Sequence, residues 1–160
     1  MDSIIAYFNG ERVQCTIGAI ASILLIACSI FFLFQQKVFL KGIAYAVIPL
    51  ATLLLVVCLG VLFGVSNHNN KVTTFYNESP GMIQSEEIPR VEQVIKTFSN
   101  LMKVEIAIGL IGLILAIVFW NNELIKGIAI GLMLMGLVLL TFDFIAESRA
   151  EKYLILLKSI

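Results

Sequence analysis

The sequence predicts an all-α protein, a polytopic membrane four-helix bundle made of two helical hairpins. Hydrophobic residues make up 59% of the 160-residue chain, charged residues make up 14%, and the mean hydropathy is +0.98. Soluble domains are about 45–50% apolar and about 25% charged, so the composition excludes a soluble domain. Four long apolar stretches follow one another along the chain, and each has the length and composition of a membrane span.

The first hairpin consists of spans at about 13–34 and 42–65. The first span contains no charged residue and exceeds the roughly 20 residues that cross a bilayer. The second contains Pro49, which predicts a mild kink. Residues 1–12 contain two acidic residues and no basic region before Arg12, so we expect a retained span rather than a cleaved signal peptide. They predict one interfacial turn of helix that ends at Asn9-Gly10.

The second hairpin consists of spans at about 104–120 and 124–145. Because the third span is uninterrupted only from 106 to 120, Lys103 must lie at the membrane edge, where its side chain can reach the interface. The tail, 146–160, places Tyr153, Leu154, Leu157 and Ile160 on one helical face. It therefore predicts an amphipathic continuation of the fourth span, along the interface or against the polar stretch.

Between the hairpins lies the only long polar stretch, 66–103, which itself has helical periodicity. Its second half carries an apolar stripe at Ile88, Val91, Ile95, Phe98 and Met102. The segment from 77 to 81, NESPG, is a turn signal. We therefore expect spans 2 and 3 to extend beyond the membrane as a coiled helical hairpin, at roughly 42–76 and 86–120. The apolar stripe would then pack against the end of span 2, the N-terminal segment or the tail of span 4.

An internal repeat relates the two hairpins. FLKGIA at 39–44 matches LIKGIA at 124–129 at an offset of 85 residues, and Phe34 matches Phe119. Because an even number of spans separates the copies, the repeat is parallel, about an axis along the membrane normal. Small residues at helical spacing, in Gly18-x-x-x-Ser22, Gly60-x-x-x-Gly64, Gly109-x-x-Gly112 and Gly127-x-x-x-Gly131, predict close helix contacts within the bundle.

Two sets of residues are candidates for function. The first is a charged layer at the membrane edge, which is either an ion or proton path or a layer of ion pairs that anchors helix ends: Arg12, Lys103, Glu105, Asp143 and Glu147. The second is a partner-binding set on the polar stretch: Glu86, Glu87, Arg90, Val91, Ile95 and Phe98. Cys15, Cys28 and Cys58 form no C-x-x-C pair and are expected to be small core residues.

No sequence motif for catalysis, phosphate binding or metal binding occurs, so we expect a non-enzyme without a cofactor. The net charge of zero gives no reason to expect a nucleic-acid partner. The end with both termini and the polar stretch has eight basic residues against three in the two short turns, which favours a cytoplasmic position for that end.

Four segments, VTTFYNESP, EEIPRVEQV, VEIAIGLIG and LTFDFIAESRAEKYL, resemble a group of short, uncharacterised four-span membrane proteins of bacteria. The resemblance covers most of the chain and implies a bacterial inner-membrane protein, but no transferable activity. The leading hypothesis is a non-catalytic protein that binds a protein partner, as an immunity protein or accessory subunit does. A small oligomeric transporter or channel that uses Glu105 and Asp143, and a lipid-binding or lipid-modifying protein, are the alternatives.

Overall fold

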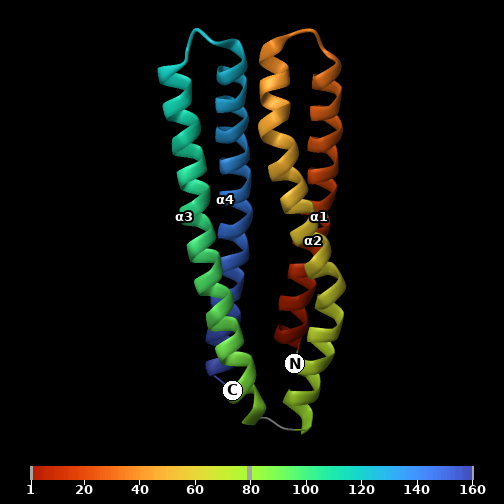
Figure 1. Cartoon of the computed structure of the whole chain (residues 1–160). Coiled ribbons are helices and arrows are strands. Elements are labelled where there is room, and N and C mark those ends of the chain that lie inside the picture. Colours follow the sequence, from red (N-terminus) through yellow and green to blue (C-terminus); the bar gives the residue numbers. More distant parts are fainter. Residues whose placement is uncertain (1, 79–80, 160) are drawn as a thin grey trace.

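Four long helices run side by side in the computed structural model, which describes residues 2–78 and 81–159 (Figure 1). They are α1 (Asp2–Phe34), α2 (Val38–Glu78), α3 (Ile88–Val118) and α4 (Glu123–Lys158), and a short π-helical segment, η1 (Ile83–Glu87), precedes α3. Each of the four long helices is long and apolar enough to cross a membrane. The prediction of an all-helical membrane protein with four packed apolar helices is therefore confirmed.

The helices pack in the order α3, α4, α2, α1 (Figure 1). Helix α4 packs against both α3 and α2, α2 also packs against α1, and α1 makes a smaller contact with α4. Among the described residues, the backbones of α2 and α3 do not approach each other closely. Two short turns join helices at one end, the turn end; both termini and η1 lie at the other, the polar end (Figure 1).

One predicted helix break, at Asn9-Gly10, is absent from the structure. Helix α1 continues through Asn9-Gly10, and the Arg149 side chain packs close to Gly10, where a Cβ would lie 3.1 Å from Arg149 Nε. Helix α4 continues without a break from span 4 into the tail, and α2 continues through Pro49. The centre of the predicted turn, Ser79-Pro80, lies outside the described residues.

Two clusters of buried side chains form the core. The cluster in the apolar half draws on α1, α2 and α4: Cys15, Ala19, Val47, Ala51, Leu54, Cys58, Met135 and Leu139. The cluster at the polar end joins all four helices and η1: Ile4, Tyr7, Phe8, Val65, Val72, Ile83, Val91, Ala150, Tyr153 and Leu157. The apolar stripe of α3 therefore lies in a core at the polar end that it shares with α1, α4 and the end of α2.

The closest contact between α2 and α4 is built from the two copies of the repeat. A Cβ added at Gly42 would lie 3.0 Å from Gly127 Cα, and one added at Gly127 would lie 3.0 Å from Gly42 Cα. One turn further on, a Cβ at Gly131 would lie 2.8 Å from the Cβ of Ala46, its counterpart 85 residues earlier. Equivalent residues thus face each other, as they do across a two-fold axis that runs between α2 and α4.

Candidate functional site: a lateral groove between α2 and α3

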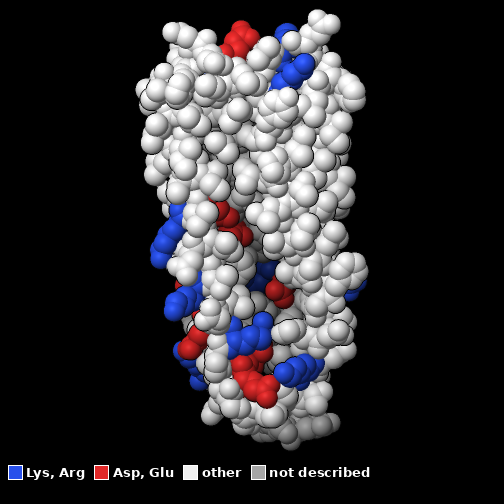
Figure 2. Space-filling model, viewed as in Figure 1, with Lys and Arg blue, Asp and Glu red and all other residues white. Residues whose placement is uncertain are grey.

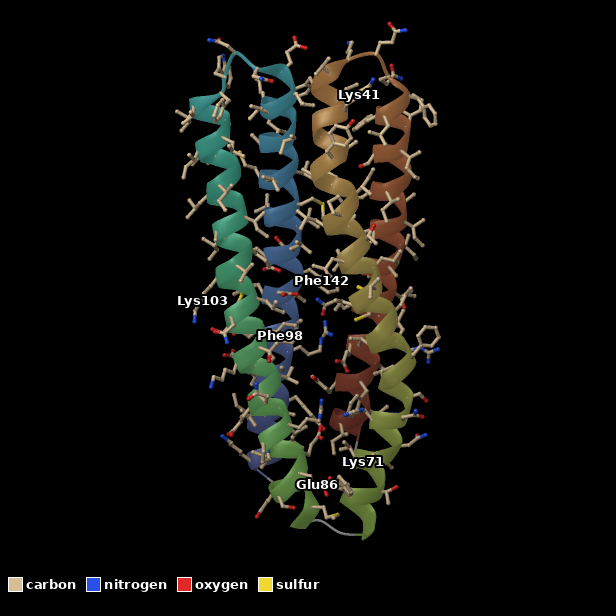
Figure 3. The ribbon with its side chains drawn as sticks, in the orientation of Figure 1. Lys41, Lys71, Glu86, Phe98, Lys103 and Phe142 are labelled. Carbon is tan, nitrogen blue, oxygen red and sulfur yellow. The ribbon has the colours of Figure 1, made fainter. Side chains whose placement is uncertain are left out.

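A groove lies between α2 and α3, with α1 and α4 as its floor. Its walls are apolar side chains that are about half exposed on the surface of the bundle: Leu53, Val57, Leu101 and Val104. The aromatic rings of Tyr7, Phe98 and Phe142 also line it, and the enclosed volume is about 180 Å³. Figure 3 shows Phe98 and Phe142 on α3 and α4 near the middle of the bundle. The groove opens sideways, through an apolar surface.

The groove continues toward the polar end as a second, more open cavity of about 470 Å³. The two cavities share Glu11, Val57, Val61, Phe98 and Leu101, so together they form one channel along the α2–α3 side, here called the α2–α3 groove. Glycines at 60 and 64 line the second cavity, and a Cβ at either would have nothing within 4 Å. Because these two residues have no side chain, open space remains beside α2 on this side of the bundle.

The floor of the α2–α3 groove carries charged groups. The carboxyl groups of Glu11, Glu105 and Asp143 and the guanidinium of Arg149 line the first cavity. Figure 2 shows red and blue atoms in the central furrow of this face, surrounded by uncharged side chains. None of these four groups forms a salt bridge within the described part of the chain. The floor of this cavity therefore carries three acidic groups and one basic group.

Glu105 is the most deeply buried of these acids. Its residue is 7% exposed, and its Oε2 atom is buried without a hydrogen-bond partner among the described residues. The Asp143 carboxyl lies close enough to interact with it. A buried carboxylate oxygen without a donor is costly, so this arrangement favours a ligand that brings a donor or a positive charge.

On the other side of the floor, Gln14 bridges α1 and α4. Its Nε2 donates to the Phe142 carbonyl oxygen at 2.7 Å, and its Oε1 accepts from Arg149 Nη2 at 2.6 Å. The Phe142 ring packs over Gly18, where a Cβ would lie 2.6 Å from the ring. We call Gln14, Phe142 and Arg149 the α1–α4 bridge. It holds these two helices together where α2 and α3 stand apart.

The predicted charged layer is only partly assembled. Glu105 and Asp143 come together in the groove, but Arg12 and Lys103 are exposed, and Lys103 points away from the bundle (Figure 3). Lys103 Nζ donates to Asn100 Oδ1 at 3.3 Å instead of pairing with an acid. Glu147 forms no ion pair among the described residues. Arg149 and Glu11, absent from the predicted layer, take the places on the floor.

Two of the predicted partner-binding residues are internal. Glu87 is 3% exposed and its carboxylate accepts hydrogen bonds from Arg90 Nε (2.8 Å), Arg90 Nη2 (2.7 Å) and the Tyr153 hydroxyl (3.1 Å). Val91 is fully buried in the polar-end cluster. The expectation that Glu87 and Val91 contact a partner is therefore wrong, because neither side chain is available at the surface.

The other members of that set lie at the edge of the core or beyond it. Ile95 packs against the polar-end cluster, and Phe98 lines the α2–α3 groove. Glu86 is exposed and pairs with Lys71 at 2.9 Å, near the tip of the polar end (Figure 3). Glu86 is thus the fully accessible member of the set.

Comparison with protein-family models, with curated proteins and with solved structures finds no match for the chain. Within residues 2–78 and 81–159, no group of three or more His, Cys, Asp or Glu side chains is placed to hold a metal ion. The α2–α3 groove is therefore interpreted from its own chemistry. Its aromatic and apolar walls suit an apolar body, and its acidic floor suits a basic group.

Proposed function

We propose that this integral membrane protein binds, inside its α2–α3 groove, an amphiphilic molecule that combines an apolar body with a protonated amine. The observation that carries the proposal is the buried, unpartnered Oε2 of Glu105 at the floor of an apolar-walled groove. An ammonium group would supply the missing donor and offset the surplus of acids. The opening through exposed apolar side chains gives such a molecule access from the bilayer.

The shape of the groove supports a small ligand. Ligand sites are typically clefts of about 300–1,000 Å³ with apolar walls and a few convergent polar groups. The two connected cavities, of about 180 and 470 Å³, fall in this range together. The aromatic rings of Tyr7, Phe98 and Phe142 add electron-rich faces for a cation.

The decisive experiment compares two probes that differ in one hydrogen-bond donor. Equilibrium dialysis with the protein in lipid nanodiscs, against empty nanodiscs, measures the binding of N,N-dimethyldecylamine and of decyltrimethylammonium. The protonated tertiary amine keeps an N–H group, whereas the quaternary ion has none. Since a hydrogen bond to a charged group contributes about 1.5–3 kcal/mol, the amine should bind at least about tenfold more tightly.

Glu105→Gln tests the same contact from the protein side. The substitution keeps the shape of the side chain and an acceptor oxygen but removes its charge, so the preference for the tertiary amine should fall severalfold, to that of an uncharged acceptor. Glu92→Gln, on an exposed part of α3, is the matched control and should bind both probes as the wild type does. Equal binding of both probes to the wild-type protein would refute the proposal.

Transport of the bound cation is a second candidate function, because the groove extends from the apolar half of the bundle to His68 at the polar end. Uptake of N,N-dimethyldecylamine into proteoliposomes, compared with protein-free liposomes, tests it. A protein that binds the amine but shows no uptake above the protein-free rate is a binding protein and not a transporter.

We further propose that the polar end lies in the cytoplasm of a bacterial cell, with the protein in the inner membrane. The greater number of basic residues at that end supports this orientation. A cysteine introduced at Lys152 should be labelled by a membrane-impermeant maleimide only after cell lysis, whereas one at Lys37 should be labelled in intact spheroplasts. The reverse pattern would place the polar end outside the cell.

A further inference from the structure

A second lateral cavity, of about 560 Å³, runs along the interface between α1 and α4. It extends on α4 from Val138 to Arg149, which lie about 16 Å apart along the helix axis at a rise of about 1.5 Å per residue. Since the hydrocarbon core of a bilayer is about 30 Å thick, this length matches one leaflet. Val13, Ile17 and Ile145 line the cavity and are about half exposed on the surface of the bundle, so it opens sideways through an apolar surface. We call it the α1–α4 groove.

The end of the α1–α4 groove nearest the polar end of the bundle carries basic groups. Arg149 lines two further cavities there, of about 400 and 280 Å³, and Lys152 lines both of them. Within the described part of the chain, no acidic residue lines any of these three cavities, and neither basic residue forms a salt bridge. The Arg149 guanidinium donates one hydrogen bond among the described residues, to Gln14 Oε1, so other N–H groups remain for a ligand.

This basic pair occurs in only one of the two copies of the repeat. The positions 85 residues before Arg149 and Lys152 hold Gly64 and Asn67, which are uncharged. The first cavity of the α2–α3 groove instead has three acidic groups on its floor. The two sides of the bundle therefore favour ligands of opposite charge.

We infer that the α1–α4 groove binds an anionic phospholipid of the surrounding bilayer, with one acyl chain along the groove and the phosphate at Arg149 and Lys152. The apolar walls accept the chain directly from the bilayer, and guanidinium and ammonium groups are the usual protein donors to phosphate. Arg149 lies about one helical turn beyond the predicted end of span 4, which is the depth of a lipid headgroup. This lipid site goes beyond the proposed function and does not depend on it.

The headgroup is tested by native mass spectrometry of the detergent-solubilised protein. The protein is titrated with phosphatidylglycerol and, separately, with phosphatidylcholine that has the same acyl chains. Each basic group near an anionic lipid contributes about fivefold in affinity, so the two together should favour phosphatidylglycerol by about 25-fold. Equal affinity for the two lipids, or binding of neither, overturns the assignment.

Lys152→Gln tests the phosphate contact from the protein side. Lys152 lines neither cavity of the α2–α3 groove, so the substitution separates the lipid site from the amine site. It should weaken the binding of phosphatidylglycerol about fivefold and leave that of phosphatidylcholine unchanged. Lys103→Gln is the matched control, because Lys103 is an exposed lysine at the predicted membrane edge that points away from the bundle (Figure 3). Equal losses in the two variants would reveal a diffuse attraction to the basic surface and overturn the site.

Ala21→Phe tests the part of the groove that receives the acyl chain. Ala21 lines the groove, so the added ring should fill part of it and weaken the binding of both lipids severalfold. Ile20→Phe, which adds a ring at an exposed neighbouring position outside the groove, is the control and should bind as the wild type does. Should Ala21→Phe fail to fold, Ile17→Ala, which removes part of an exposed wall, should weaken both lipids at least twofold. Unchanged binding by the folded variant overturns the placement of the chain.

Discussion

Gly127→Ala tests whether the contact between the two halves fixes the bundle. The added methyl group would overlap the Phe39 carbonyl oxygen and lie 3.0 Å from Gly42 Cα, where carbon atoms normally stand about 3.5–4.0 Å apart. All of these neighbours are backbone atoms, so relief requires α2 and α4 to separate. Overpacking costs about 1–3 kcal/mol, and alanine returns at most about 1 kcal/mol of helix propensity.

We therefore expect Gly127→Ala to lower the free energy of unfolding by about 1–2 kcal/mol, which corresponds to a fall of about 5 °C in Tm for a chain of this size. Thermal unfolding in detergent can be followed with a thiol-reactive dye. Cys15 and Cys58 are buried and react on unfolding, and Cys28 is replaced by serine because it is exposed.

Gly109→Ala is the matched control, because a Cβ at that glycine has nothing within 4 Å. It should leave Tm unchanged or raise it slightly. The double variant Gly42→Ala, Gly127→Ala should lose less than the sum of the two single losses, because the first methyl group already separates the helices that the second one meets. A Tm for Gly127→Ala equal to that of Gly109→Ala would refute the reasoning.

Two further stability effects should be measurable in the same assay. Glu87→Gln should lower the free energy of unfolding by about 2 kcal/mol, since it removes the charge that Arg90 and the Tyr153 hydroxyl share inside the polar-end core. Glu92→Gln, in an exposed ion pair, should lower it by less than about 1 kcal/mol. Equal losses for the two variants would contradict the structural role of Glu87. Asn122→Ala should cost about 1 kcal/mol, because the Asn122 side chain accepts hydrogen bonds from the first backbone N–H groups of α4, and no loss would mean that this cap contributes nothing.

The number and length of the helices follow from hydropathy alone, but the ends of the helices do not. Asn9-Gly10 has the local signature of a break, yet α1 continues there, and Arg149, far along the chain, packs against Gly10. The apolar stripe that contains Val91 was recognisable from its spacing. Its partners were not, because periodicity identifies a buried face without saying which helix covers it.

The small-residue motifs illustrate the same limit. Gly127 and Gly131 lie at a close helix contact, as predicted, whereas Gly60 and Gly64 face open space in the groove. Glycine spacing allows two backbones to approach but does not supply the second helix. The same spacing therefore produces a tight interface in α4 and an unfilled surface in α2.

The candidate site was hidden in the sequence for a related reason. Glu105 and Asp143 were identifiable as acids near the membrane edge, but Glu11 and Arg149 carried no signal of their own. A comparison of the two halves position by position does carry one, because Gly64 stands where the other half has Arg149.

The two halves of the chain share one architecture. Positions with the same residue in both halves serve the common fold, and positions with different residues mark where the functions of the halves differ. Gly42 and Gly127 agree, and they form the axis of the bundle. Gln14 and Arg149 hold α1 against α4, but their counterparts, Ser99 and Gly64, are too small to hold α3 against α2. Side chains from both halves thus connect α1 to α4, whereas the side of the bundle between α2 and α3 is left as a groove with acidic groups on its floor.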